Sequence, residues 1–509
     1  MIVNFSSSIR VGLLTFISRV FGYIRDLLIS FFFGANLETD AFYVAFRIPN
    51  LFRRLLAEGT LSTTIVPFFT ELSLSNDNNL FKKIRSDIFT IIFLTLFFVT
   101  LIFYFFSKEI IALFAFGFDQ QTSEASSQLL KNMSPFLFLI SLSALNMGLL
   151  NSIKKFNAPA FSPVMLNLGI ICTLIISHLF FSLDIFLLSY AVLFGALLQY
   201  GFQLPFIFKN NLNYFFTFTD IINDRTINII RVIVPQVFGL AIYNLNILIN
   251  TQFASFMEKG SVTYLYLAER LIEFPLGIFA VSIATTSLPD FTNLYLNKKF
   301  KEFATLINDR IKFLLFLSTP CAVAFMFLGT TICSILYSRG KFTDADAALT
   351  AKALFAYSIG LVFVAGVRVV TQAFYAIKDT KTPVWFAGSN LIINCVLCYF
   401  FGFFLNLGFI GLALASSISA AVLFALLTIR LRKHFHEIDI IGIVKYFIII
   451  LAISILSILL SSWVVEFVKA TYFDFGLSIS FIFIVLLSVF AYIGLAKLAG
   501  LKELGMIFK

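Results

Sequence analysis

Long apolar runs constrain this chain more than any other feature of its sequence. Residues 88–106, 443–460 and 477–495 carry almost no charge, and about 18 or more apolar residues span roughly 30 Å of hydrocarbon. Backbone groups in lipid need internal hydrogen-bond partners, and these runs lack the alternation of barrel strands. The sequence therefore predicts an all-α integral membrane protein.

Composition supports this class. Hydrophobic residues make up 60% of the 509 residues and charged residues only 13%, whereas soluble domains carry about 25% charged residues. So little charge leaves too little polar surface to cover a water-soluble globule of this size. Arg19, Arg25 and Asp26 interrupt the first apolar stretch, so we do not expect a cleavable signal peptide.

The alternation of apolar windows with charged or Pro/Gly breaks predicts about fourteen transmembrane helices. Pro275 lies inside one of them and predicts a bend, which serves either as a hinge or as a fixed kink. The predicted spans are 11–33, 40–72, 86–107, 126–152, 160–181, 184–207, 226–256, 262–296, 311–336, 347–376, 383–403, 408–429, 443–465 and 476–496.

The charges of the connecting loops predict the orientation. Alternate loops are rich in lysine and arginine, and such loops face the cytoplasm. We therefore expect both termini to be cytoplasmic, and we attribute the net charge of +10 to these loops rather than to nucleic-acid binding. The basic set is Lys82, Lys83, Arg85, Lys154, Lys155, Lys209, Lys298, Lys299, Lys301, Lys378, Lys381, Arg430, Arg432 and Lys433, and the opposite loops hold only Lys108, Lys259, Arg339, Lys341 and Lys469.

The sequence repeats itself weakly at a spacing of roughly 222 residues. Thr63–Phe69 resembles Thr285–Phe291, and the segment 151–159 resembles 375–383. An even number of helices per repeat gives two halves of the same orientation, as in some transporters. We therefore predict two six-helix lobes around a central cavity, residues 1–210 and 211–435. Residues 436–509 would add helices 13 and 14 and a cytoplasmic tail.

Ionisable residues crowd into three of the predicted helices, where burial in lipid is costly unless they face a polar interior or a partner. They are Arg19, Arg25 and Asp26 in the first helix, Asp40, Arg47, Arg53, Arg54 and Glu58 in the second, and Glu269, Arg270 and Glu273 in the eighth. One interpretation is that these residues form anchors and internal salt bridges. Arg54 and Glu58 have ion-pair spacing, and Glu269 and Glu273 flank Arg270.

The alternative interpretation is an anion site. The first helix and the start of the second hold more arginine than carboxylate, so some guanidinium lacks an internal partner. Such a group is tolerable in a water-filled cavity that receives an anion, and the planar fork of arginine fits phosphate. The sequence thus favours a large, phosphorylated, anionic substrate, bound by Arg19, Arg25, Arg53, Arg54 and Arg270.

Catalytic and metal-binding signatures are lacking in the sequence. Five cysteines lie in apolar segments, three histidines form no ligand cluster with them, and no P-loop motif occurs. We therefore expect a protein that is not an enzyme and that has neither a metal site nor a cofactor.

Several blocks resemble the MurJ (MviN) family of lipid II flippases. Ser18–Asp26 reads SRVFGYIRD and Thr39–Arg54 reads TDAFYVAFRIPNLFRR; Ala57–Gly59, Ala268–Pro275, Gly340–Thr343 and Lys381–Pro383 also match. The resemblance runs from the first predicted helix into the twelfth, while the last two helices match mainly in hydropathy. Glu269 stands where some relatives carry aspartate, so the charge is kept.

The resemblance implies the fold of the multidrug/oligosaccharidyl-lipid/polysaccharide exporter superfamily. It also implies transfer of undecaprenyl-pyrophosphoryl-disaccharide-pentapeptide from the inner to the outer leaflet of the bacterial cytoplasmic membrane. Residues matching Arg19, Arg25, Arg53 and Arg270 would line the cavity, Asp40 would contribute, and helices 13 and 14 would form a groove for the lipid tail. We assign charge pairing or gating to Asp26, Glu58, Glu269 and Glu273.

The expected partners are lipid II and membrane lipids, with a monovalent cation and the cell-wall synthesis machinery as further candidates. Three rival functions stay open: a flippase for another polyprenyl-linked glycan, a drug/cation antiporter of the same fold, and a scaffold that does not transport. A cationic drug would need unpaired carboxylates, whereas the predicted cavity is basic.

Overall fold

The computed structural model describes residues 5–53, 55, 66–74, 78–180, 182–218, 223, 226–227, 231, 245–471 and 476–507. Within these ranges the chain is helical, and its one β feature is an isolated antiparallel bridge between Arg339 and Phe342. The prediction of an all-α fold is confirmed.

Eleven helical spans in the described ranges are long and apolar enough to cross a membrane. The predicted number of fourteen is not confirmed. The helices predicted at 40–72 and 226–256 lie partly outside the described residues, and the helix that contains the predicted span 11–33 is not among the eleven. The spans are α4 (Asn78–Phe105), α6 (Gln120–Ser152), α7 (Asn157–Phe180), α8 (Ile185–Lys209), α10 with η2 and α11 (Ser261–Pro275, Leu276–Ala280, Val281–Leu296), α12 (Phe300–Tyr337), α13 (Asp344–Ala376), α14 with η3 (Lys381–Tyr399, Phe400–Phe404), α15 (Gly408–His434), α16 (Ile440–Thr471) and α17 (Leu477–Leu498).

Five further helices are α1 (Phe5–Phe33), α2 (Leu37–Arg53), α3 (Val66–Leu74), α5 (Ser107–Phe114) and α18 (Leu504–Ile507), and residues 245–254 are also helical. Several helices are longer than predicted. Helix α12, for example, begins at Phe300 rather than at 311. Hydropathy detects only the part of a helix that matches hydrocarbon, and helical hydrogen bonding continues through the polar residues beyond it.

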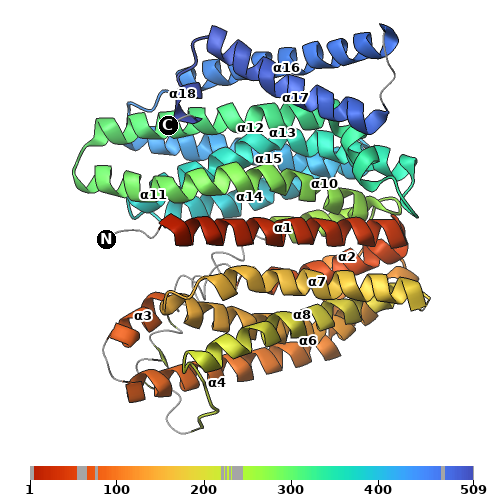
Figure 1. Cartoon of the computed structure of the whole chain (residues 1–509), viewed down its shortest axis with the longest axis vertical. Coiled ribbons are helices and arrows are strands. Elements are labelled where there is room, and N and C mark those ends of the chain that lie inside the picture. Colours follow the sequence, from red (N-terminus) through yellow and green to blue (C-terminus); the bar gives the residue numbers. More distant parts are fainter. Residues whose placement is uncertain are drawn as a thin grey trace. The chain divides into compact units, whose positions relative to one another are not determined.

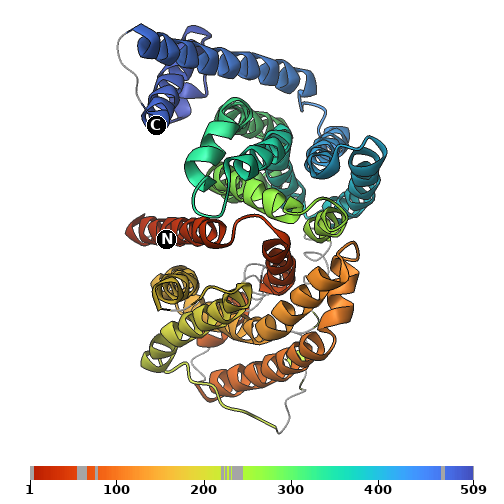
Figure 2. The ribbon, with the colours of Figure 1, turned by 90° about the vertical axis from the view of Figure 1, so that its right-hand side faces the viewer.

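The chain divides into two units, Met1–Thr263 and Tyr264–Lys509. In the first unit α6 packs against α2, α4 and α8, and α7 packs against α1 and α8 (Figure 1). In the second unit α13 packs against α11, α12 and α15, while α16 packs against α12 and α17 (Figure 2). Each unit therefore has a long central helix, α6 or α13, which most of its other helices contact.

The same helix ending closes α6 and α13. Each helix has 33 residues, and each is followed after one residue by a lysine with positive φ, 61° at Lys154 and 63° at Lys378. In both, the lysine amide donates to the carbonyl three residues earlier, and the next amide donates to the carbonyl five residues earlier. A left-handed residue with these two bonds is a standard helix termination. The same ending also follows α8, α11 and α17, with positive φ at Asn211, Lys298 and Gly500, so it is a common helix ending in this chain and the internal repeat stays a prediction.

An extended segment follows α8 and lies along α4 within the first unit. The amides of Phe215 and Thr217 donate to Ser86 Oγ and Thr90 Oγ1, and the Thr217 hydroxyl donates to Asp87 at 2.8 Å. Because no β-strand lies beside this segment, side chains on α4 accept the hydrogen bonds of its backbone amides. The segment is thereby fixed to the first unit, immediately after its last long helix.

Pro275 ends α10, and a π-helical turn, Leu276–Ala280, follows it directly before α11. Proline lacks an amide proton and crowds the preceding turn, and π turns mark irregular positions in helices. The irregularity predicted at Pro275 is therefore present, immediately after the segment that carries Glu269, Arg270 and Glu273.

Helices α7 and α8 approach each other closely at two glycines. A Cβ atom on Gly169 would lie 2.5 Å from the Gly195 Cα, and one on Gly195 would collide with the Leu166 carbonyl oxygen. Small residues permit such close backbone approach between membrane helices. Gly201, on the same helix α8, has open space at its Cβ position.

We expect Gly195→Val to destabilise the protein by about 1–3 kcal/mol, because an overpacked contact forces the two helices apart. Gly201→Ala is the matched control, and we expect it to be neutral or to stabilise by about 0.5–1 kcal/mol. Thermal unfolding of the purified protein in detergent measures both changes. Equal stabilities for the two variants would contradict the close approach.

Candidate functional site

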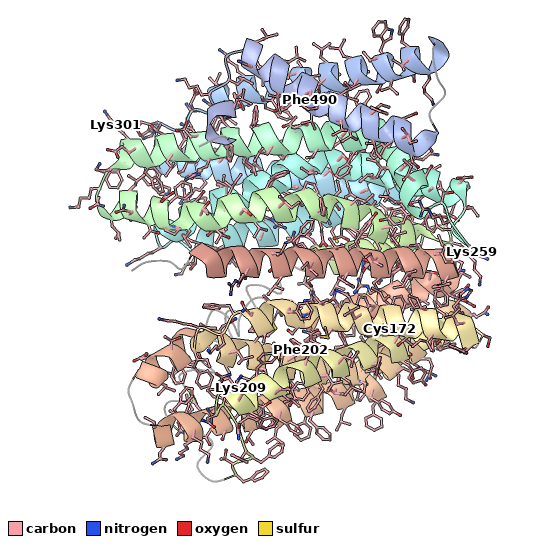
Figure 3. The ribbon with its side chains drawn as sticks, in the orientation of Figure 1. Cys172, Phe202, Lys209, Lys259, Lys301 and Phe490 are labelled. Carbon is pink, nitrogen blue, oxygen red and sulfur yellow. The ribbon has the colours of Figure 1, made fainter. Side chains whose placement is uncertain are left out.

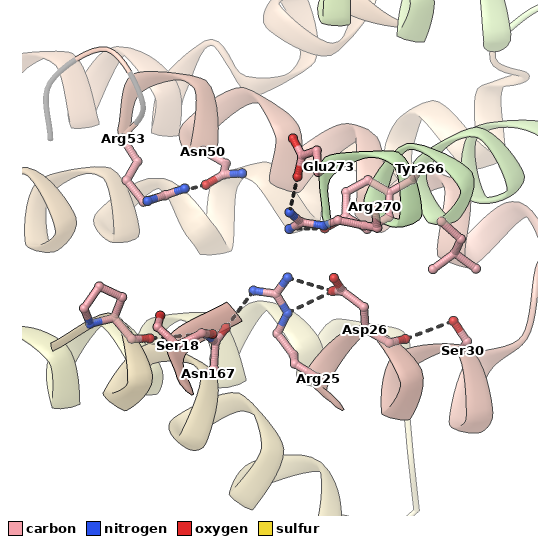
Figure 4. Close-up of polar contacts among 12 residues, drawn as sticks. Ser18, Arg25, Asp26, Ser30, Asn50, Arg53, Asn167, Tyr266, Arg270 and Glu273 are labelled. Carbon is pink, nitrogen blue, oxygen red and sulfur yellow. Dashed lines mark hydrogen bonds and ion pairs between the residues drawn. The ribbon is translucent and has the colours of Figure 1, made fainter. Parts of the chain in front are cut away.

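Arg25 lies at the centre of a buried polar cluster on α1. Only 5% of Arg25 and 1% of Asp26 are exposed. The guanidinium donates to Asp26 Oδ1 through Nε at 3.0 Å and Nη2 at 2.7 Å, and Nη1 donates to Asn167 Oδ1 on α7 at 3.0 Å (Figure 4). The guanidinium carbon of Arg25 also lies 5.6 Å from the centre of the Phe46 ring on α2. Arg25 therefore links three helices of the first unit.

Arg19 and Arg53 occupy more open positions in the same unit. Arg19, six residues before Arg25 on α1, is exposed and has neither a hydrogen bond nor an ion pair within the described residues. Arg53 ends α2 and is partly exposed, and its Nε donates to Asn50 Oδ1 at 2.7 Å. Both guanidinium groups are thus left at least partly uncovered by the rest of the chain, as the binding of an anionic group requires.

Arg270 on α10 has partners within the second unit. Its Nη1 donates to Glu273 Oε2 at 2.9 Å, and Nε and Nη2 donate to the Tyr266 hydroxyl at 3.2 and 2.9 Å. The pairing expected between Arg270 and Glu273 is confirmed. About a quarter of the Arg270 side chain and a third of Glu273 stay exposed, so an anionic ligand has access to the guanidinium.

Asp40, near the start of α2, binds the beginning of α10. Its carboxylate accepts hydrogen bonds from the Gly260 amide at 2.8 Å, the Thr263 amide at 2.8 Å and the Thr263 hydroxyl at 2.6 Å. These amides belong to the first turn of the helix, where backbone donors lack helical partners. Asp40 therefore acts as an N-cap from another helix, and we call this set of bonds the Asp40 clasp.

A second bond joins the same elements. Arg47 lies on the same face of α2 as Asp40, two turns later. It donates a hydrogen bond to the hydroxyl of Thr251, which belongs to the helical residues 245–254. Both Arg47 and Thr251 are buried. Arg47 is thus engaged in holding helices together, which matches the structural interpretation of the charged stripe on α2 rather than the ligand-binding one.

The remaining candidates are placed only in part. Arg54 and Glu58 lie outside the described residues. Glu269 is partly exposed on α10 beside Arg270. The expectation that some guanidinium groups of the first helix and the start of the second lack an internal partner needs correction for Arg25 and Arg53, which have acceptors within hydrogen-bond distance. The physical reason is local: neighbours at i+1 and i−3 on the same helices supply the acceptors.

Five residues that shape the site were not predicted from the sequence. Asn167 holds Arg25, Asn50 holds Arg53, Tyr266 holds Arg270, and Gly260 and Thr263 bind Asp40. A polar amide inside an apolar helix was a usable signal for Asn167, since such groups need partners in lipid. The tyrosine, glycine and threonine carried no comparable signal, because all three are common in membrane helices.

We expect Asp40→Ala to lower the unfolding free energy by about 1–3 kcal/mol, because two buried amides lose their acceptor. Glu109→Ala, at an exposed position in the first turn of α5, is the control and should have little effect. Thermal unfolding with and without substrate measures the difference. If Asp40→Ala were as stable as the wild type, water would replace the hydrogen bonds of the Asp40 clasp without any loss of unfolding free energy.

The fold and these polar clusters define a multi-pass helical membrane protein that holds arginines and carboxylates within its helices. The family model described as "Lipid II flippase MurJ" matches residues 29–496 of the chain. The chain therefore belongs to the MurJ lipid II flippase family, and the family resemblance inferred from the sequence is confirmed.

Relatives from several bacteria agree. The chain is 35% identical over 431 residues to a probable lipid II flippase MurJ of Buchnera aphidicola subsp. Acyrthosiphon pisum, covering 84% of this chain and 83% of the relative. It is 33% identical over 439 residues to a probable lipid II flippase MurJ of Vibrio cholerae, covering 83% and 81%. Identity to the lipid II flippase MurJ of Burkholderia cenocepacia is 32% over 434 residues, covering 84% of each.

Solved structures show the same fold. A lipid II flippase MurJ in an inward closed conformation superposes with a TM-score of 0.80 at 28% identity, covering 96% of this chain and 99% of that one. An inward-facing multidrug resistance MATE family transporter of the MOP superfamily superposes with a TM-score of 0.70. Because the identity to the latter is 14% over 83% of this chain and 95% of that one, the likeness concerns the fold alone.

Proposed function

We propose that this chain moves lipid II from the inner to the outer leaflet of the bacterial cytoplasmic membrane by alternating access. Membership of the MurJ family over residues 29–496 carries the proposal. The arginines on α1, α2 and α10 supply its chemistry, since guanidinium groups bind pyrophosphate through paired, charge-assisted hydrogen bonds.

In this mechanism the pyrophosphate of the substrate replaces acidic side chains as the partner of the arginines. Arg19 and Arg53 are accessible and make the first contacts with the pyrophosphate. Arg270 then releases Glu273 and turns to the substrate, while the Tyr266 hydroxyl keeps its orientation. Arg25 stays paired with Asp26 and positions α1 against α7. The arginines are proposed to converge on one cavity between two lobes, residues 1–210 and 211–435. The last two predicted helices, 443–465 and 476–496, which correspond to α16 and α17, are proposed to hold the lipid tail.

The Asp40 clasp closes the far side of this cavity. With both termini in the cytoplasm, the start of α2 and the start of α10 lie at the external face. Three bonds to one carboxylate hold them together in the present conformation. Opening outward then requires that Asp40 release Gly260 and Thr263, and neutralisation of the arginines by substrate favours the state in which this occurs.

The driving force is proposed to be the membrane potential or an ion gradient. The sequence carries no P-loop, and one charge crossing a potential of 100 mV supplies about 2.3 kcal/mol. A monovalent cation is the candidate coupling ion, and the cell-wall synthesis machinery is the candidate consumer on the far side. We assign no catalytic step to the protein.

A flippase for another polyprenyl-linked glycan would need the same arginines, so the glycan must be tested directly. In liposomes that hold the purified chain and fluorescent lipid II, we expect the labelled headgroup to become accessible from the opposite leaflet. A polyprenyl pyrophosphate that carries an unrelated glycan should not move. Movement of the unrelated glycan alone would overturn the assignment of lipid II and leave the fold unaffected.

A further inference from the structure

A pocket of about 830 Å³, lined by apolar surface with several charged and polar side chains, lies in the first unit, apart from the arginine clusters. Five segments line it: the turn before α2 with the start of that helix, the start of α5, the N-terminal part of α6, the start of α8, and the turn that holds Lys259. Pockets for small ligands span roughly 300–1,000 Å³. This one can therefore enclose a group of the size of a short glycopeptide fragment.

The pocket lies at one end of the helix bundle. Lys259 on its rim is far from Lys209, which marks the opposite end of α8 in the same unit (Figure 3). Lys108 and Lys259 belong to the sparsely basic set of loops, which the charge rule assigns to the external side. In the proposed orientation the pocket thus faces away from the cytoplasm.

Charges of both signs line this pocket. Lys108 and Lys259 supply two ammonium groups, and Glu38 and Glu124 supply two carboxylates. Within the described residues neither lysine lies within ion-pair distance of a carboxylate, and the four side chains are exposed to solvent. The net charge of the lining is zero, so a bare anion gains little here, whereas a zwitterionic ligand finds a partner for each of its charges.

Neutral groups add hydrogen bonds and one aromatic surface. The carboxamides of Asn36, Gln121 and Gln128 line the pocket together with Phe186. Carboxamides donate and accept at once, as the hydroxyl and amide groups of sugars and peptides do. An aromatic side chain offers an apolar face for the C–H side of a sugar ring.

The helix ends around the pocket do not themselves provide the site. Asn36, Asp119 and Asp184 accept hydrogen bonds from the first-turn amides of α2, α6 and α8. Hydrogen bonds from the side chain and the backbone of Thr122 also hold the pKa of Asp119 below its ordinary value. The backbone donors are therefore occupied, and a ligand would be held by the side chains.

We propose that this pocket binds the hydrophilic, zwitterionic glycopeptide headgroup of the transported lipid on the external side of the protein. The inference rests on the proposed function and adds to it an external site for the headgroup, separate from the arginines that bind pyrophosphate. The lysines bind peptide carboxylates, the glutamates bind a free amino group, and the carboxamides of Gln121 and Gln128 bind sugar and peptide groups.

The pocket also adjoins the Asp40 clasp. Lys259 directly precedes Gly260, and Glu38 stands two residues before Asp40. A headgroup that bridges Lys259 and Glu38 therefore contacts both sides of the clasp. Binding and release of the headgroup on the external side are thereby coupled to the closing and opening of the Asp40 clasp between α2 and α10.

The test uses the full chain in lipid nanodiscs and a soluble, lipid-free disaccharide-pentapeptide whose stem has a free amine. We expect the probe to bind, and to bind about threefold to tenfold more weakly to Lys108→Gln/Lys259→Gln and to Glu38→Gln/Glu124→Gln, as partly exposed charge contacts predict. The control Lys209→Gln/Lys301→Gln changes exposed lysines elsewhere and should leave the affinity unchanged.

A chemical change of the probe makes the assignment specific. Acetylation of the stem amine should weaken binding to the wild type and to the lysine double variant, but not to Glu38→Gln/Glu124→Gln, which has already lost the contact. Equal affinity of all variants would overturn the proposed site. Failure of the probe to bind a wild type that still moves lipid II would also overturn it, leaving the flippase function intact. Binding with no lipid II movement would instead count against the flippase assignment.

Discussion

Replacing Arg270 with alanine is expected to abolish lipid II transport while the protein stays in the membrane at normal abundance. The guanidinium is partly exposed and is held by the Tyr266 hydroxyl and Glu273, so its loss leaves no unpaired group in a closed core. Each hydrogen bond to a charged group contributes about 1.5–3 kcal/mol. Loss of two contacts to pyrophosphate thus lowers transport by about a hundredfold or more. Headgroup accessibility in liposomes measures the change.

Two further variants separate charge from geometry at this position. Arg270→Lys keeps the charge but loses the planar fork, so we expect transport between that of the wild type and that of Arg270→Ala. Glu273→Gln removes the competing carboxylate and should strengthen binding of undecaprenyl pyrophosphate. Full transport by Arg270→Ala, or unchanged pyrophosphate binding by Glu273→Gln, would contradict the partner exchange.

Replacing Arg25 with alanine should have the largest effect on stability, because it removes the guanidinium that forms an ion pair with the buried Asp26 carboxylate. Only 1% of Asp26 is exposed, and breaking a buried ion pair by removing one partner costs about 3–5 kcal/mol. The Asn167 carboxamide also loses its donor. We expect low abundance and a marked fall in the unfolding temperature, measured by thermal unfolding in detergent.

The paired variant Arg25→Met/Asp26→Leu tests this cause. Replacing both charges with apolar groups of similar size is often neutral or stabilising, so we expect the double variant to regain abundance. Transport should stay impaired, because α1 loses its hydrogen bond to α7. A double variant as unstable as Arg25→Ala would show that the ion pair is not the source of the effect.

Much of the fold could be predicted from the sequence, because lipid leaves the backbone few alternatives. Apolar windows located the spans now described from α4 to α17, while the predicted repeat of two six-helix lobes stays a prediction. Helix ends were predicted less well. Residues 300–310 continue α12 beyond its apolar part, and hydropathy gives no signal for a helix in water.

The sequence indicated which residues to consider for the candidate site, but it did not indicate most of their hydrogen-bond partners. Counting arginines against carboxylates along the helices identified Arg19, Arg25, Arg53 and Arg270. It gave no account of Asn50, Asn167 and Tyr266, which supply the partners of three of them. The Asp40 clasp depends on contact between residues more than 200 positions apart, which no local pattern predicts. Local spacing did predict the i,i+3 pair of Arg270 and Glu273.

The most direct test of the central claim is the location of lipid II in cells depleted of this protein. Our account predicts that lipid II accumulates in the inner leaflet, and that the wild-type chain restores its appearance in the outer leaflet whereas Arg270→Ala does not. Normal outer-leaflet lipid II in depleted cells would contradict the account and would favour another polyprenyl-linked glycan as the substrate.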